Sequence, residues 1–359
     1  MSNRREVSVV VFDAAYPPPV IGGKEKQAHL LSKGLVNIGV KVHVVSFRHN
    51  GNRSSNFEGI KVTRLRRDFF LPFTIILNLL KLRGSANILH IHTPSQIGRI
   101  VAVLGKIFRF SIVFKFPGQS LAEYAGLLDK FSWNLVFKCS SALVVLESDT
   151  YERLLAKKLA CSKIKRMANG VLLGTPVQSN NKTCVQLLFV GRLVELKRCV
   201  DLIHACATLN SRKVGFFLRV VGDGPERKVL GRLVEDLQLQ DNVLFEGFRE
   251  DAVSLMSESD ILVLPSRTEG MSNVILEAMS IGLPVVATDV GAARDLLGEF
   301  GSRFIMPPFR PDLLSKVIEN LIVDEQLRND YSRNLFFHCK ERFSIDSVAQ
   351  KYKEMYADL

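Results

Sequence analysis

Residues 260–288 constrain the fold of this chain more than any other stretch. Residues 260–264 (Asp-Ile-Leu-Val-Leu) are a short apolar run of the kind that forms a buried parallel strand. After a Pro-Ser turn, Ser272 stands where a helix N-cap is expected, and apolar residues then recur on one helical face. Gly282 ends that helix before the next apolar run, residues 285–288. The stretch therefore predicts a strand–loop–helix–strand unit of an open α/β sheet.

Two carboxylates occupy defined places in this unit. Glu269 lies in the loop after the first strand, and Glu277 follows two helical turns later. Ligands of open α/β sheets bind at the carboxyl ends of strands, where the amides near Ser272 and Asn273 would attract an anion. A carboxylate beside such amides suits a ligand with both phosphate and hydroxyl groups, such as a sugar nucleotide. The alternative is that Glu269 stabilises the helix dipole and that Glu277 is a solvated helix residue.

The order Glu-Gly, apolar helix, Glu-Ala-Met and Gly-x-Pro resembles the E-x7-E signature of the retaining GT-B glycosyltransferases of family 4 (glycosyl transferases group 1). The resemblance implies that Glu269 is catalytic and holds hydroxyls of the donor sugar, and that Glu277 holds the ribose. It also implies further donor-binding residues in the same loop: Gly270, Met271, Ser272 and Asn273.

A second pair of charges follows the apolar run of residues 186–190. Gly191 and Arg192 come directly after this predicted strand, and Lys197 follows five residues after Arg192. A planar guanidinium and a compact ammonium at one strand end suit a diphosphate, although two such cations are also common on a solvated surface. The resemblance gives Arg192 and Lys197 the role of neutralising the leaving nucleoside diphosphate. It also places the nucleotide base near Phe248 and Arg249.

The chain begins with another βαβ pattern of Rossmann type. A strand over residues 7–12 precedes a loop that ends in Gly22-Gly23, and a helix and a strand over residues 42–47 follow. No G-x-G-x-x-G is present, so the dinucleotide fingerprint is missing. Gly22 and Gly23 are either a simple turn or a close backbone approach to phosphates. The resemblance favours donor binding by this glycine loop.

The acceptor side is less well defined by sequence. A strand over residues 88–92 ends in His92, which resembles the family's Asp-x-x-His-x-His. One strand later the family often has a histidine, where this chain has Phe-Pro-Gly (residues 116–118). The role of that histidine therefore does not carry over, and Lys115 or Gln119 is a candidate substitute.

Length and charge indicate two domains with different partners. A chain of 359 residues favours two domains. Up to residue 175 it carries 26 Lys and Arg against 10 Asp and Glu, and the rest carries 22 against 26. The basic half predicts an anionic partner, for which nucleic acid and an anionic membrane surface both qualify. Basic residues from Arg64 to Arg83 flank an aromatic and aliphatic run, which is either an interfacial membrane anchor or a core helix with solvated ends.

We therefore predict an α/β protein of the GT-B class, with two Rossmann-like doubly wound domains facing a central cleft. Residues 1–178 would bind the acceptor and residues 179–342 the nucleotide-sugar donor, with a polar linker over residues 178–183. Residues 343–359 would form a helix that crosses back to the first domain. The six cysteines are scattered, which favours reduced thiols and makes a zinc site unlikely.

The resemblance implies a retaining, hexosyltransferase-type enzyme that transfers a sugar from a nucleotide-sugar, with a UDP-sugar favoured, to a glycan or lipid-linked acceptor. Bacterial cell-surface polysaccharide or lipopolysaccharide biosynthesis is the expected setting. No signal peptide is apparent, and we expect a cytoplasmic protein bound peripherally to the inner face of the membrane. No metal, cofactor or nucleic-acid partner is expected. Two alternatives stay open: a GT-B sugar-nucleotide epimerase and a non-catalytic, basic nucleic-acid-binding protein.

Overall fold

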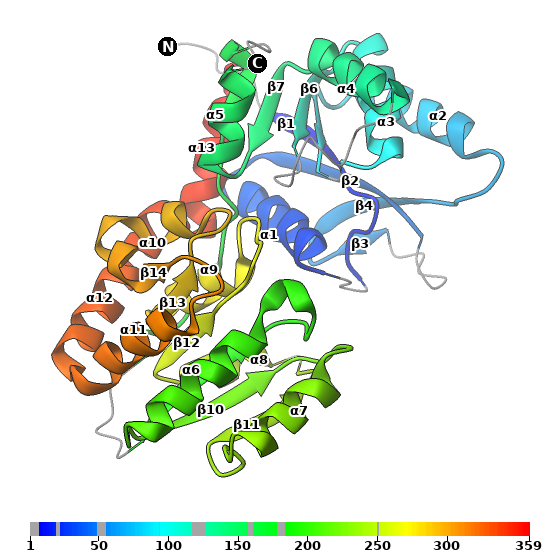
Figure 1. The fold of residues 1–359 in the computed structure, drawn as a ribbon. Coiled ribbons are helices and arrows are strands. Elements are labelled where there is room, and N and C mark those ends of the chain that lie inside the picture. Colours follow the sequence, from blue (N-terminus) through cyan, green and yellow to red (C-terminus); the bar gives the residue numbers. More distant parts are fainter. Residues whose placement is uncertain are drawn as a thin grey trace. The chain divides into compact units, whose positions relative to one another are not determined.

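A computed structural model describes residues 7–18, 22–48, 55–92, 94–116, 127–156, 161–177, 184–249 and 251–359. The chain divides into two compact units (Figure 1). Domain 1 comprises Met1–Gly170 and Ile345–Leu359, and domain 2 comprises Val171–Ser344. The sequence predicts these divisions after residues 178 and 342. Residues 171–177 go with domain 2 because Gly174 and Val177 donate backbone hydrogen bonds to Ser280 and Ile281 of that domain. The expected linker, residues 178–183, lies outside the described residues.

Domain 1 is built on a sheet with the strand order β3-β4-β2-β1-β5-β6-β7-β8 among the described residues. Neighbouring strands are parallel except β3 and β4, which pair antiparallel. The strands are β1 Ser8–Phe12, β2 Lys41–Phe47, β3 Asn56–Phe57, β4 Ile60–Leu65, β5 Ile88–Ile91, β6 Ser111–Lys115, β7 Ala142–Val145 and β8 Ile164–Arg166.

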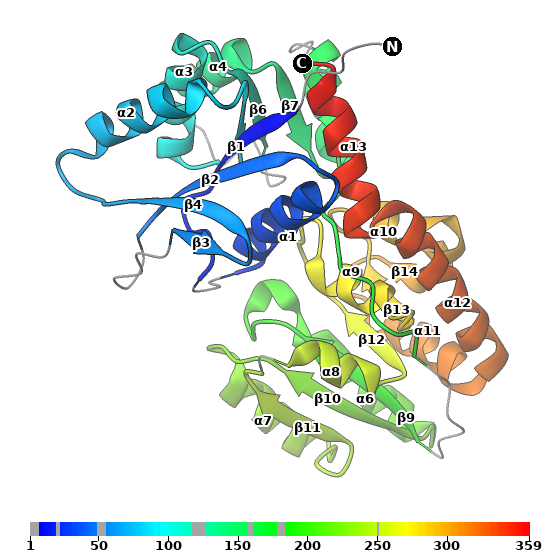
Figure 2. The same ribbon diagram turned by 180° about the vertical axis from the view of Figure 1, so that it is seen from behind.

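Helices cover both faces of this sheet, so its central strands are continuous apolar runs, as expected of a parallel sheet. One face packs against α1 Gly23–Asn37 and α13 Ile345–Ala357. The other face packs against α2 Leu71–Arg83, α3 Gln96–Ile107, α4 Leu127–Cys139 and α5 Ser148–Ala156. A short 3-10 turn, η2 Cys161–Lys163, leads into β8. Figure 2 shows α13 beside α1 from the reverse side.

Domain 2 contains a parallel sheet with the order β11-β10-β9-β12-β13-β14 among the described residues. Its strands are β9 Val185–Val190, β10 Phe216–Val221, β11 Val243–Gly247, β12 Ile261–Leu264, β13 Val285–Thr288 and β14 Ile305–Met306. Its helices are α6 Cys199–Ser211, α7 Arg227–Asp236, α8 Ala252–Ser257, α9 Asn273–Ser280, α10 Ala293–Gly301, α11 Pro311–Val323 and α12 Glu325–Arg342. Two 3-10 turns, η3 Glu195–Lys197 and η4 Ser302–Phe304, complete the domain. The fold thus contains two Rossmann-like domains, as the sequence predicts.

Each sheet reverses its winding direction at one internal position. In domain 1 the chain winds outward from β1 through β2 to β4 and β3, and then restarts at β5 on the other side of β1. In domain 2 it winds from β9 to β11 and restarts at β12 beside β9. Loops on either side of such a switch point diverge and leave room for a ligand at the carboxyl ends of the strands. The pairs β1–β5 and β9–β12 are therefore where functional side chains are expected.

Candidate functional site

The switch point of domain 2 brings Lys197 and Glu269 into contact. Lys197 ends η3 after β9, and Glu269 lies in the loop between β12 and α9. The Lys197 Nζ is 2.5 Å from the Glu269 Oε1, and the two side chains are 23% and 15% exposed. The Ser266 hydroxyl donates to the same Oε1 over 2.8 Å. One oxygen of the Glu269 carboxylate therefore accepts from two donors, which fix the orientation of the side chain.

The second carboxylate oxygen, Oε2 of Glu269, takes no partner from the described part of the chain. Glu269 thus has one oxygen that is held by the protein and one that is available to a ligand. Lys197 is held at its ammonium by this same carboxylate, so its position is set before a ligand arrives. Such preorganisation is what a site needs to stabilise charge that develops during a reaction.

Close backbone contacts hold the loop after β12. Gly291, with φ of +57°, lies so near this loop that a Cβ on it would be 2.3 Å from the Glu269 carbonyl oxygen. Only glycine fits this left-handed conformation at such a distance. The Thr288 hydroxyl donates to the Ser266 carbonyl oxygen over 2.5 Å. The Arg267 amide donates over 2.8 Å to the carbonyl oxygen of Leu196, in the loop after β9.

The loop after β9 rests on the Gly222-x-Gly224 turn. A Cβ on Gly222, whose φ is +137°, would be 1.8 Å from the Gly191 carbonyl oxygen. A Cβ on Gly224, whose φ is +159°, would be 2.3 Å from the Leu193 carbonyl oxygen. The two glycines therefore let the turn after β10 support the segment that carries Arg192.

Arg192 is exposed, and no other described residue pairs with its guanidinium. It differs in this respect from Lys197, which already contacts Glu269. Domain 2 therefore offers one unpaired cation and one positioned cation on a single loop at the switch point. Together they suit an anion of two or more charges, and a guanidinium binds phosphate oxygens in a bidentate manner.

The loop after Glu269 leads into α9 as the sequence predicts. Ser272 is the N-cap, and its hydroxyl oxygen accepts a long hydrogen bond, 3.5 Å, from the Ile275 amide. Met271 is buried, and Asn273 and Glu277 are partly exposed on α9. Glu269, Gly270 and Ser272 line a small pocket with mainly apolar neighbours from the adjoining strands and helices: Leu264, Ile275, Ala287, Thr288, Val290 and Ala293.

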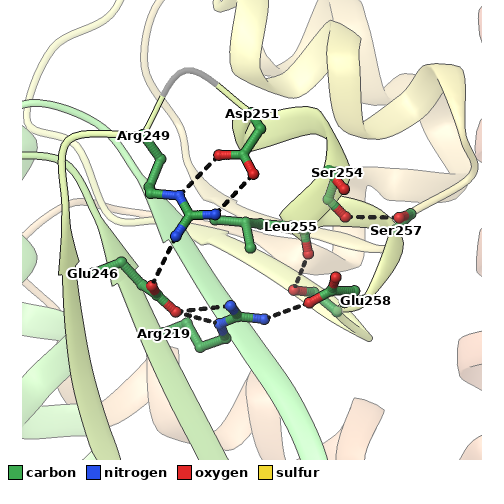
Figure 3. A network of polar contacts seen from close by, with 9 residues as sticks. Arg219, Glu246, Arg249, Asp251, Ser254, Leu255, Ser257 and Glu258 are labelled. Carbon is green, nitrogen blue, oxygen red and sulfur yellow. Dashed lines mark hydrogen bonds and ion pairs between the residues drawn. The ribbon is translucent and has the colours of Figure 1, made fainter.

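The structure places Phe248 and Arg249 just after the outer strand of the sheet. They follow β11, which is separated from β9 by β10. The Phe248 side chain is 74% exposed, as an aromatic surface for a base would need to be. The Arg249 guanidinium donates to both oxygens of Asp251 over 2.8 Å each. Figure 3 shows that this pair continues through Glu246 to Arg219 and Glu258, so the Arg249 side chain belongs to a surface network of charges.

Domain 1 contains a buried polar cluster at its own switch point, made of Asp13, His92, Lys115 and Asn169. Asp13 and His92 directly follow β1 and β5, and Lys115 ends β6. The Lys115 Nζ is 3.1 Å from the His92 Nε2 and donates to the Asn169 Oδ1 over 2.9 Å. The His92 Nδ1 is 3.6 Å from the Asp13 Oδ2. All four residues are at most 8% exposed.

Burial shifts the proton affinities of this cluster strongly. It lowers the pKa of Lys115 from 10.5 to about 7, although the nearby Asp13 carboxylate raises it. Burial and the neighbouring Lys115 hold the pKa of His92 well below its ordinary value. His92 is therefore neutral near pH 7, and Lys115 is poised between its charged and neutral forms. Perturbed groups at a switch point are candidates for function.

The other residues that the sequence predicted in domain 1 lie around this cluster or outside the described part. Gly22 and Gly23 begin α1, with exposed backbone. One helical turn later the Gln27 amide donates to the Gly170 carbonyl over 2.9 Å and accepts from the Gly170 amide over 3.1 Å. This pair anchors the turn that contains Asn169. Gln119 lies outside the described residues.

Sequence reasoning missed Ser266, Thr288 and Gly291 in domain 2 and Asp13 and Asn169 in domain 1. Asp13 carried a usable signal, because it is the first polar residue after a buried strand. Gly291 and Thr288 carried none, since their partners lie more than twenty residues away in the chain. In the part of the chain that the structure describes, no three His, Cys, Asp or Glu side chains group in a way that could hold a metal ion.

Comparison with known proteins finds a family match in the second half of the chain. Residues 176–335 match the family model described as glycosyl transferases group 1. This range contains Arg192, Lys197, Glu269 and Glu277.

Curated relatives and a solved structure extend this finding. The α-D-kanosaminyltransferase of Streptomyces kanamyceticus is 31% identical over 175 residues, or 48% of this chain, and the chain spans only 45% of that relative. The lipopolysaccharide core biosynthesis glycosyltransferase LpsE of Rhizobium meliloti is 28% identical over 48% of this chain and 49% of its own. An uncharacterized glycosyltransferase of Methanocaldococcus jannaschii, MJ1607, is 26% identical over 98% of this chain and 97% of its own.

The crystal structure of Anabaena Alr3699/HepE in complex with UDP superposes with a TM-score of 0.82, at 20% identity, and covers 98% of this chain and 100% of that one. The fold is GT-B. The GT-B fold confirms the fold class that the sequence predicted for both halves of the chain.

Proposed function

We propose that this protein is a retaining glycosyltransferase of family 4 that transfers a hexosyl group from a UDP-sugar to a glycan or lipid-linked acceptor. The contact between Lys197 and Glu269 carries the proposal. It places a positioned cation beside a carboxylate that has one oxygen available to a ligand, at the switch point of a GT-B domain. The match of residues 176–335 to glycosyl transferases group 1 supports it.

The donor would bind to domain 2 through its charges and hydroxyls. Arg192 and Lys197 would bind the diphosphate, Arg192 through its unpaired fork and Lys197 through the donors that Glu269 does not occupy. The Oε2 of Glu269 would accept a hydrogen bond from a hydroxyl of the sugar. Glu277, two turns along α9, would hold the ribose, and the backbone at Phe248 and Arg249 would hold the base.

Transfer would proceed by attack on the same face of the sugar that the diphosphate leaves. The acceptor hydroxyl forms the new bond to the anomeric carbon while the bond from that carbon to the diphosphate oxygen breaks. The hydroxyl proton passes to the departing phosphate oxygen. Arg192 and Lys197 stabilise the negative charge that grows on the diphosphate, and we propose that they do so without a metal ion or cofactor.

The cellular setting is proposed from the relatives and from the charge of the chain. A relative named for lipopolysaccharide core biosynthesis supports a role in bacterial surface polysaccharide assembly. The balance of 26 basic against 10 acidic residues up to residue 175 supports a cytoplasmic enzyme at the anionic inner face of the membrane. None of the relatives named above is named as an epimerase or as a nucleic-acid-binding protein, so neither alternative gains support.

A panel of labelled sugar nucleotides tests the proposal. The wild-type protein should hydrolyse one donor slowly and transfer its sugar when an acceptor is present. Glu269→Gln keeps the shape of the side chain but loses its charge, so we expect transfer to fall by about two orders of magnitude or more. Glu195→Gln is the matched control, since Glu195 lies on η3 of the same site but is 71% exposed. Equal rates for Glu269→Gln and the wild type with a verified donor would refute the role of Glu269.

A further inference from the structure

Helix α2 of domain 1 presents an uncovered apolar stripe. Its inner side places Ile75, Leu79 and Leu82 in the core of the domain. Its outer side is equally apolar: Phe70, Phe73, Leu77 and Leu80 recur at helical spacing and are 64%, 59%, 47% and 50% exposed. Phe69, which precedes them, is 92% exposed. A helix that is apolar on all sides is ordinarily buried, so the outer side of α2 indicates a surface that is covered by something else.

The helices beside α2 expose further apolar side chains. Helices α2, α3 and α4 lie together on one face of the sheet (Figure 1 and Figure 2). Ile100 and Ile107 of α3 and Phe131 of α4 are 56%, 66% and 65% exposed. We call the set Phe69, Phe70, Phe73, Leu77 and Leu80 the α2 stripe.

The charges around the α2 stripe are mainly positive. From Phe69 to Phe116 the sequence contains six Lys and Arg and no Asp or Glu. Of these, Lys81 and Lys106 are exposed at the C-terminal ends of α2 and α3. Arg66 and Arg67 are exposed just before the stripe, where Asp68 is the one acidic neighbour and pairs with Arg66 over 3.5 Å. A partner that covers this surface must therefore be apolar at its centre and anionic around it.

Arg64 does not belong to this surface, although the sequence analysis counted it there. Its side chain is buried, and its guanidinium donates over 2.9 Å to the Tyr16 carbonyl oxygen and also to that of Pro17. The basic rim is thus made by Arg66, Arg67 and Lys81. The alternative of a core helix with solvated ends is wrong for the outer side of α2, because that side is exposed.

We infer that the α2 stripe is a docking surface for an anionic lipid bilayer, into whose interface Phe69, Phe70 and Phe73 insert while Arg66, Arg67 and Lys81 contact the headgroups. An exposed helix with aromatic residues at its N-terminal end and mainly cations around it matches the chemistry of an interfacial helix. No helix in the described ranges is both long enough and apolar enough to cross a bilayer.

This inference rests on the proposed function, because a lipid-linked acceptor explains why the protein would bind a membrane. Its test, however, requires neither donor nor acceptor. The full-length protein is sedimented with vesicles of phosphatidylcholine alone or mixed with phosphatidylglycerol, at low and at high salt. We expect binding to the mixed vesicles at low salt and weaker binding at high salt, because salt screens the basic rim. No binding to the mixed vesicles at low salt would overturn the inference, whatever the outcome of the transfer assay.

Paired variants separate the apolar and the charged contributions. Phe69→Ser with Phe70→Ser should weaken binding to the mixed vesicles by roughly a hundredfold, because two exposed aromatic rings are lost. Arg66→Ala with Arg67→Ala should weaken it by about thirtyfold. The matched control is Val229→Ser with Val323→Ser, which removes two apolar side chains that are 66% and 74% exposed in domain 2 and should bind as the wild type does.

Two further outcomes would also refute the membrane assignment. Equal loss of binding in the control variant would show that any exposed apolar residue has this effect. Sedimentation velocity on each variant tests whether a second copy of the chain covers the stripe. If the Phe69 and Phe70 substitutions dissociate an oligomer of the wild-type protein and leave vesicle binding unchanged, the stripe is a protein–protein contact. Unchanged fluorescence of Trp133, a buried residue of domain 1, verifies the fold of the domain 1 variants, and an unchanged circular dichroism melt verifies that of the control variant in domain 2.

Discussion

The buried Lys115 makes the stability of domain 1 depend on pH in a direction that can be calculated. Its pKa is about 7 in the folded protein and 10.5 for an ordinary lysine. Below pH 7 both the folded and the unfolded state bind the proton, and the full cost of the buried charge applies. Between pH 7 and 10.5 the unfolded state alone keeps the proton, so the free energy of unfolding rises with pH. Above 10.5 neither state is charged and the cost is gone.

The magnitude follows from the width of this window. The difference between the two pKa values lowers the free energy of unfolding of domain 1 by about 5 kcal/mol at low pH. About 2 kcal/mol of this loss is regained as the pH rises from 7 to 9. Lys115→Met keeps the length of the side chain but removes the proton. It also removes the hydrogen bonds to His92 and Asn169, which costs about 1–3 kcal/mol at every pH. We therefore expect Lys115→Met to stabilise domain 1 near pH 7 and to lose about 2 kcal/mol of that advantage by pH 9.

Trp133 provides the assay, because it is the only tryptophan of the chain and is buried in the core of domain 1. Urea unfolding followed by its fluorescence reports on domain 1 alone, which avoids a two-domain transition. Lys106→Met, at the exposed end of α3, is the control and should show no such pH dependence. If the gain in unfolding free energy of Lys115→Met over the wild type stays constant or grows from pH 7 to pH 9, the lowered pKa of Lys115 is refuted.

Three other substitutions test the remaining parts of the two sites. Arg192→Ala and Lys197→Ala should each weaken the binding of a free nucleoside diphosphate by about 1–3 kcal/mol in calorimetric titration, and wild-type affinity in both would exclude a diphosphate site. Gly291→Ala should destabilise domain 2 by more than about 2 kcal/mol in circular dichroism melts, because its positive φ and the carbonyl 2.3 Å away leave no room for a Cβ. Gly231→Ala, at a helix position with no atom within 4 Å of the added Cβ, should be neutral or stabilising, and equal effects of the two would contradict the steric argument. Gln27→Leu should lose about 2–4 kcal/mol of domain 1 stability by Trp fluorescence, since it leaves a buried peptide group without its two partners.

Local patterns in the sequence were sufficient for much of the fold. The apolar runs, the glycine stops and Ser272 predict the unit β12–α9–β13, and the structure has these elements with Ser272 as the N-cap. They do so because strand and helix formation at these positions depends on residues close in the chain: a continuous apolar run, a side chain that caps the first turn, and a glycine that ends the last one. The same reasoning placed Glu269 at the carboxyl end of a strand.

Segment boundaries and exposure were less predictable. The chain from Arg64 to Arg83 is mainly basic and apolar in sequence, but Arg64 is buried under the loop after β1 while Phe69 is 92% exposed. Whether an apolar residue of α2 faces the core or the solvent depends on which helices pack beside it. That packing is not encoded in the periodicity of α2, because both of its sides are apolar.

The sequence by itself therefore determined the two α/β halves, the ends of their strands, and the residue types available at each end. Only the tertiary structure decided which of these residues meet. Lys197 and Glu269 are 72 positions apart, and they touch because β9 and β12 are neighbours in the sheet order. Lys115 and Asn169 are 54 positions apart and share a buried hydrogen bond at the carboxyl ends of the strands of domain 1. Strand order depends on which apolar surfaces exclude water most completely when all elements pack together, so a local pattern cannot specify it.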